Sequence, residues 1–196
     1  MKHTGYISEK EKKNSRFFLL CIVEIIGILI GSYIAVSDTN TDWFRKFLCP
    51  VLNGGTLSEI FRSTFISSLI FIVAAFLFGL FAFGQPLGVA LIISKGIEIG
   101  LSAAMMYSVK GISALPAVFI LNVPKAVAVS VVMILAVREV IRNSMSILHG
   151  LIPEREYDSE RADLKLYCIK FIVLIVIIFI ISVADSLLNY IFASLV

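Results

Sequence analysis

Long apolar tracts alternate along this chain with short polar segments. Five tracts, at about residues 17–36, 64–83, 87–107, 116–137 and 167–190, approach the roughly 20 apolar residues that a helix needs to cross the hydrocarbon core of a bilayer. Backbone polar groups have no water partner at that depth, so each tract is expected to be helical. The pattern predicts an all-α integral membrane protein, a five-transmembrane-helix bundle forming a single membrane domain over residues 1–196.

The segment between the first two tracts, residues 38–62, has an apolar pattern of its own. Trp43, Phe44 and Phe47 recur at helical spacing with basic residues on the other side, which predicts a short interfacial helix with Trp43 at headgroup depth. Thr56 and Glu59 then have the spacing of a capping box, which would start the second helix. An ordinary polar loop is the alternative for this segment.

The segment between the last two tracts, residues 138–166, is the most polar part of the chain. The helical pattern of the fourth tract continues into it as far as Gly150, so the last turns are expected to leave the membrane or follow its inner surface. Arg138, Glu139 and Arg142 would then be solvated. The remainder is interpreted as a solvated linker, with a docking patch for a cytoplasmic partner as the alternative.

Composition supports lipid as the solvent of the tracts. Hydrophobic residues make up 59% of the chain and charged residues only 16%, whereas about a quarter of a typical soluble domain is charged. The first tract is longer than the 7–15 apolar residues of a secretory signal. We therefore expect it to be retained as a helix.

Lysines and arginines beside the tracts indicate an orientation. Eleven lie in the N-terminal segment, between the fourth and fifth tracts or, as Lys170, at the start of the fifth, and four lie in the other flanks. Five spans place the two rich segments on one side, which the positive-inside rule assigns to the cytoplasm, whereas four or six spans would spoil this separation. The N-terminus is expected to be cytoplasmic and the C-terminus extracytoplasmic.

Five acidic or basic residues lie well inside the tracts: Glu24, Lys95, Glu98, Lys125 and Asp185. Each costs about 2.5–3.5 kcal/mol at the centre of a membrane helix, so such residues usually face the bundle interior and find partners. Lys95 and Glu98 are three residues apart and share one helix face, so they are expected to neutralise each other. The sequence leaves the partners of Glu24 and Asp185 open.

Small residues and a proline accompany these charges. Gly27 and Gly31 in the first tract, and Gly96 and Gly100 in the third, have the spacing that lets two helices approach closely. These faces could pack within one chain or in a homo-oligomer. Pro124 removes an amide donor from the fourth tract and should kink that helix. Together these residues predict a helix-packing site with a polar lock.

We expect no enzyme, no cofactor, no metal site and no nucleic-acid partner. The chain lacks an H-E-x-x-H motif, a G-x-S-x-G elbow and a Walker-type glycine-rich loop. Two interpretations of the intramembrane charges remain. In the structural interpretation, the charges hold five helices in register. In the functional interpretation, they form a polar path in a small permease or an accessory subunit of a transporter.

The middle third of the chain contains a series of turn and glycine motifs. A Gly-x-Pro turn opens the third tract, a Lys-Gly step with a further glycine follows, a second Lys-Gly pair ends the tract, and a proline before a polar residue lies in the fourth: Gly84, Pro86, Lys95, Gly96, Gly100, Lys110, Gly111, Pro124 and Lys125. With five spans and a basic N-terminus, these motifs resemble the stage II sporulation protein M family. The charges of Glu98 and Lys125 depart from the family pattern.

The resemblance implies a non-catalytic scaffold of the cell membrane. Such a protein would anchor or recruit extracytoplasmic peptidoglycan hydrolases at the septal membrane while the forespore is engulfed in endospore-forming bacteria. On this reading, residues 38–62, with Trp43, Phe44 and Phe47, and residues 187–196 are the expected partner-contact surfaces.

Overall fold

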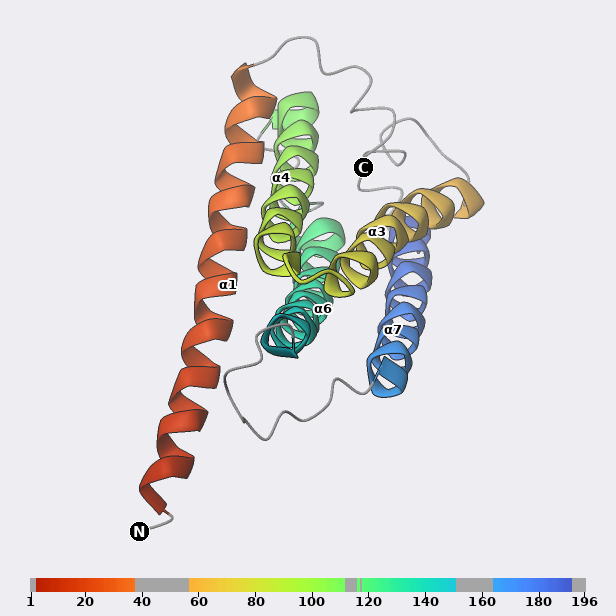
Figure 1. Cartoon of the computed structure of the whole chain (residues 1–196). Helices are drawn as coiled ribbons and strands as arrows, with labels where there is room; N and C mark the ends of the chain where they lie inside the picture. The colour runs from red at the N-terminus through yellow and green to blue at the C-terminus, as the bar shows by residue number, and fades with distance from the viewer. Residues whose placement is uncertain (1–2, 38–56, 112–115, 117, 151–163, 192–196) are drawn as a thin grey trace.

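The computed structural model describes residues 3–37, 57–111, 116, 118–150 and 164–191. The described part is helical: α1 (His3–Ser37), α3 (Leu57–Gly79), α4 (Gly84–Lys110), the π-helix η3 (Val118–Asn122), α6 (Val123–Gly150) and α7 (Leu164–Ile191) (Figure 1). The predicted all-α fold is confirmed. The predicted interfacial helix with Trp43, Phe44 and Phe47 lies outside the described residues.

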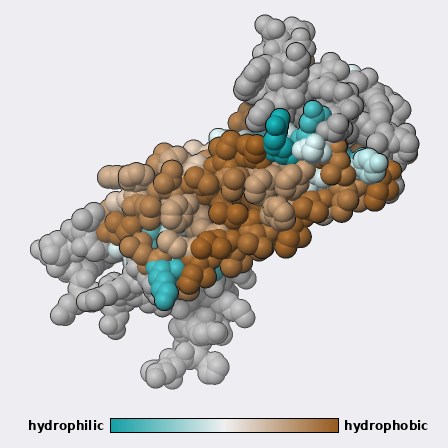
Figure 2. Space-filling view, turned by 90° about the vertical axis from the view of Figure 1, so that its right-hand side faces the viewer, coloured by the Kyte–Doolittle hydropathy of each residue, from teal (hydrophilic) through white to brown (hydrophobic). Residues whose placement is uncertain are grey.

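Five of the described helices are long and apolar enough to cross a membrane. Their candidate spans are Phe17–Ser37, Leu57–Gly79, Gly84–Ser108, Phe119–Leu148 and Leu164–Ile191. The protein is therefore a multi-pass membrane protein of five apolar helices. Figure 2 shows that the face over α3 and α7 is largely hydrophobic, with hydrophilic residues towards its ends. Such a surface suits contact with lipid acyl chains rather than water.

The helices form two pairs around a central member. α1 and α4 lie side by side and run in the same direction, α3 packs against α7, and α6 contacts all four of these helices (Figure 1). The main apolar core lies between α3, α6 and α7. Ile72, Met133, Val140 and Ile178 are at most 1% exposed there, with Phe171 beside them.

The second and third helices meet earlier than the sequence predicted. α3 begins at Leu57, as the capping-box spacing predicted, but ends at Gly79 instead of residue 83, and α4 begins at Gly84 instead of residue 87. Turn hydrogen bonds, including Gly84 N–H to the Phe81 carbonyl at 3.1 Å, close the connection. Pro86 is accommodated in the first turn of α4, where an amide donor would have no intrahelical partner.

The last turns of α6 pack against the turn between α3 and α4, a contact that the sequence did not predict. Asn143 and Ser144 are buried, and they donate hydrogen bonds to the carbonyls of Gly79 at 2.7 Å and Ala82 at 2.8 Å. The Ser144 hydroxyl also accepts from Gly84 N–H at 3.0 Å. These side chains bind backbone groups that the end of α3 leaves open, so α6 packs beneath the α3–α4 turn.

Glu139 was predicted to be solvated, but its side chain is largely buried. Its side chain is only 13% exposed, and its Oε2 lies 2.8 Å from Arg142 and 3.0 Å from Lys170 of α7. The Arg142 side chain is 55% exposed. This end of α6 is thus joined to α7 by an ion pair, while Arg142 keeps most of its contact with the surroundings.

Replacing Gly84 by alanine is expected to destabilise the protein by about 1–3 kcal/mol, the usual range for overpacking. The new Cβ would collide with the backbone oxygen of Phe78 and would press on the Ser144 side chain. A denaturant titration of the purified protein in detergent measures the effect. Gln85→Ala, in the same helical turn, is the control and should change stability little. Equal stability of both variants would contradict the tight turn.

Candidate functional site: a polar network between the helices

The glycines of α1 and α4 face one another where these two helices meet. A Cβ on Gly27 would lie 2.6 Å from the Ile93 carbonyl oxygen, and one on Gly96 would lie 2.6 Å from the Glu24 carbonyl oxygen. Gly31 and Gly100 are similarly blocked by the backbone of Ile97 and Ile28. The two small-residue faces are therefore used within one chain, and the backbones touch directly.

Lys95 and Glu98 form the first ion pair of the network. Lys95 Nζ lies 2.9 Å from Glu98 Oε2, and the Lys95 side chain is 4% exposed. Ser67 of α3 donates to Glu98 Oε1 at 2.6 Å and accepts from Lys95 at 3.4 Å. The ammonium also lies 4.8 Å from the centre of the Phe71 ring. The pair within α4 is thus completed by α3, which binds both of its members.

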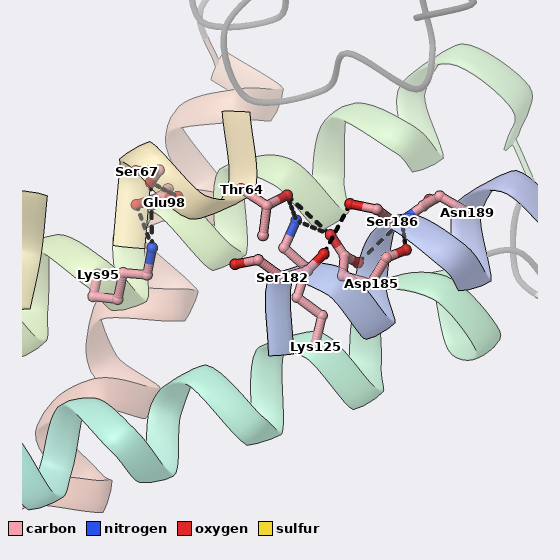
Figure 3. Close-up of polar contacts among 9 residues, drawn as sticks. All are labelled: Thr64, Ser67, Lys95, Glu98, Lys125, Ser182, Asp185, Ser186 and Asn189. Atoms are coloured by element: carbon pink, nitrogen blue, oxygen red, sulfur yellow. Dashed lines mark hydrogen bonds and ion pairs between the residues drawn. The ribbon is translucent and has the colours of Figure 1, made fainter. Parts of the chain in front are cut away.

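Lys125 and Asp185 form the second ion pair and join α6 to α7. Their Nζ and Oδ2 atoms are 3.0 Å apart, and the Asp185 side chain is 2% exposed. Thr64 of α3 donates to Asp185 Oδ2 at 2.9 Å and accepts from Lys125 at 2.9 Å. Asn189 donates to Asp185 Oδ1 at 3.0 Å, so both carboxylate oxygens are bound (Figure 3). Three helices therefore meet at this pair.

The two ion pairs border a polar cavity of about 40 Å³ between α3, α4 and the start of α6. Its charged lining residues are Lys95, Glu98 and Lys125, and hydroxyl and amide side chains surround them: Ser63, Thr64, Ser67, Ser68, Ser102 and Asn122. Figure 3 shows Ser67 with the first pair and Thr64 with the second. A polar cavity of this size can hold about three water-sized occupants.

Glu24 is the interior carboxylate without an ion pair among the described residues. It is 4% exposed, and its Oε1 has no hydrogen-bond partner there. The Ser130 hydroxyl of α6 and, further away, the Lys95 ammonium face it. Glu24 therefore lies behind the first ion pair, on the α1 side of α4.

A change of helix type precedes the second ion pair. The π-helix Val118–Asn122 leads into α6, whose second residue is Pro124. Pro124 has no amide hydrogen for the carbonyl four residues earlier, so a regular α-helix cannot continue unbroken through this point. Asn122 and Lys125 flank the irregular turn and both line the cavity. Short π-helices are rare and occur often at functional sites.

The remaining motif residues lie apart from the network. Gly84 and Pro86 form the turn and first helical turn described above, and Lys110 is the last residue of α4. Gly111 has φ 59°, in the left-handed region that glycine adopts without strain, and ends that helix.

Sequence reasoning missed the hydroxyl and amide partners. Thr64, Ser67 and Asn189 are buried and hydrogen-bond to the charged groups, and Tyr167 donates to the Phe76 carbonyl at 3.0 Å near the other end of the bundle. The signal was present in α3, where Thr64, Ser67 and Ser68 lie on the buried face of an otherwise apolar helix. Buried hydroxyls at helical spacing indicate a polar partner on a neighbouring helix.

The fold and these contacts define a multi-pass membrane protein in which four of the five predicted intramembrane charges form ion pairs that also bind hydroxyl groups. No protein-family model matches the chain, and no curated protein or solved structure matches it either.

Proposed function

We propose that this protein is a non-catalytic membrane scaffold that anchors or recruits peptidoglycan hydrolases at the septal membrane during forespore engulfment. The observation that carries the proposal is the pairing of Lys95 with Glu98 and of Lys125 with Asp185 inside the bundle. Groups bound in this way fix helix positions, as a rigid membrane platform requires. The sequence motifs that resemble the stage II sporulation protein M family supply the process and the kind of partner.

The scaffold would present its partner surfaces outside the cell. The distribution of lysine and arginine places the N-terminus in the cytoplasm and the C-terminus outside under the positive-inside rule. Residues 38–62 and 187–196 would then meet extracytoplasmic hydrolases. Trp43, Phe44 and Phe47 are the proposed contacts in the first of these segments, since aromatic side chains are common anchors of interfaces.

Affinity capture from sporulating cells tests this function. The tagged full-length protein is expected to recover at least one cell-wall hydrolase after crosslinking. A matched variant with Trp43, Phe44 and Phe47 replaced by serine should reach the membrane in the same amount but recover much less hydrolase. Capture of no hydrolase by the unaltered protein, despite its presence in the septal membrane, would refute the scaffold function.

A second candidate is a small permease or an accessory subunit of a transporter. The π-helix before Pro124, beside a cavity lined by Lys95, Glu98 and Lys125, favours it, because transporters often place irregular helices at their binding sites. The joint change Lys95→Leu and Glu98→Leu discriminates between the two. Hydrolase recruitment that survives in a correctly inserted double variant would support the scaffold. Loss of recruitment, together with loss of a solute flux that the unaltered protein supports, would support transport.

A further inference from the structure

The charged residues well inside the membrane tracts include one more acid than base. Lys95 and Lys125 are the two bases, and each ammonium lies 2.9 or 3.0 Å from a carboxylate oxygen. Those carboxylates belong to Glu98 and Asp185. Glu24 is the remaining acid, so an ionised Glu24 would leave these five residues with one uncompensated negative charge.

Hydrogen-bond donors distinguish Glu24 from the other two acids. Glu98 accepts from the Lys95 ammonium with Oε2 and from the Ser67 hydroxyl with Oε1. Asp185 likewise has donors at both of its oxygens (Figure 3). Glu24 Oε1, in contrast, has no hydrogen-bond partner among the described residues. An ionised carboxylate can only accept hydrogen bonds, so the surroundings of Glu98 and Asp185 suit the charged form and those of Glu24 do not.

The Glu24 side chain is enclosed between α1, α4 and α6. Glu24 lies on the buried stripe of α1 between Leu20 and Gly27, and it is 4% exposed. Among the described residues, the groups that face its carboxyl are the Lys95 ammonium of α4, already paired with another acid, and the Ser130 hydroxyl of α6. A negative charge enclosed in this way is costly, and binding a proton removes that cost.

We infer that the Glu24 carboxyl is a proton-binding site inside the bundle and that it is occupied at neutral pH. The bound proton cancels the uncompensated charge and gives the side chain an O–H donor. It also leaves Lys95 to Glu98, because a neutral Glu24 does not compete for the ammonium group. The contact of α4 with α3 through this ion pair is thereby preserved. The inference goes beyond the proposed scaffold function and does not rest on it.

Infrared spectroscopy of the purified full-length protein, in a detergent without ester groups, tests the site directly. At neutral pH the unaltered protein is expected to show the carbonyl stretching band of a protonated carboxylic acid, and Glu24→Gln should lack this band. Glu139→Gln, which removes an ion-paired carboxylate of α6, is the control and should keep it. Absence of the band from the unaltered protein would mean that Glu24 is ionised, with water or a metal cation as its partner, and would overturn the inference. A band that persists in Glu24→Gln would overturn it as well.

Thermal unfolding of two amide variants at neutral pH supplies a second test. Glu24→Gln replaces a neutral carboxyl by a neutral amide of nearly the same shape, so the melting temperature is expected to change little. Asp185→Asn makes the same chemical change to an acid that is ion-paired with Lys125, and its melting temperature should fall clearly below that of Glu24→Gln. A fall for Glu24→Gln as large as that for Asp185→Asn would show that Glu24 acts as a charged carboxylate, and would contradict the inference.

Discussion

Lys95→Leu is expected to lower the free energy of unfolding by about 3–5 kcal/mol, the usual effect of removing one partner of a buried ion pair. Lys95 is 3% exposed, and its loss leaves the Glu98 carboxylate between α3 and α4 with the Ser67 hydroxyl as its remaining direct partner. A largely buried carboxylate in that position lacks a counter-charge within its own helix face. Much less folded protein should therefore accumulate in the membrane.

The joint change Lys95→Leu and Glu98→Leu is expected to recover most of the lost stability. Both charges are then absent, and two apolar side chains of similar length replace them within an apolar bundle. Folded protein in membranes and denaturant titration in detergent measure both variants. Lys170→Leu, which removes a partly exposed partner of Glu139, is the control and should cost about 1 kcal/mol or less. Equal losses in the single and double variants would contradict mutual neutralisation of the pair.

Gly100→Leu is expected to separate α1 from α4 and to destabilise the protein by about 3 kcal/mol, the upper end of the range for overpacking. Even a Cβ at this position would overlap the backbone of Ile28, which cannot rotate away as a side chain can. The Ser32 hydroxyl, which donates to the Gly100 carbonyl at 3.3 Å, would lose its partner as the helices part.

A matched change on the same helix checks the Gly100 effect. Ser94 is exposed on α4, and its hydroxyl bonds only within its own helix, to the Ala90 carbonyl at 2.9 Å. Ser94→Leu adds the same bulk towards lipid and should leave the melting temperature nearly unchanged. A melting temperature that falls as much for Ser94→Leu as for Gly100→Leu would show that the glycine contact has no special role.

The helices could be predicted from the sequence because lipid allows the chain few choices. An apolar tract of about 20 residues must be helical in a bilayer, and this rule found all five spans. The ion pair of Lys95 with Glu98 was also predictable, since residues three apart on one helix are neighbours whatever the bundle around them.

Long-range contacts could not be predicted from the sequence. The ion pair of Lys125 with Asp185 depends on how α6 and α7 are rotated about their axes, and hydrophobic periodicity is weak where both the core and the lipid are apolar. The packing of the end of α6 was beyond prediction for a related reason. Its polar residues Asn143 and Ser144 bind backbone groups at the α3–α4 turn instead of water.

The start of α3 at Leu57 was predictable from the capping-box spacing, but its C-terminal end was not. The tract at 64–83 includes Phe81 and Phe83, which are apolar enough to extend a span, yet the structure uses Leu80–Phe83 as a turn. Hydropathy indicates whether a residue lies in lipid or in water, but not which backbone conformation it adopts. An apolar turn is therefore mistaken for part of a helix.

The number of membrane crossings is the claim on which the account depends most, and reporters fused to the two ends of the chain test it directly. Five crossings predict that green fluorescent protein fluoresces when it is fused to the N-terminus, and that alkaline phosphatase is active when it is fused after Val196. Exchanging the two reporters should abolish both signals. Fluorescence from both ends, or phosphatase activity at both ends, would place the termini on one side of the membrane and contradict the five-span bundle.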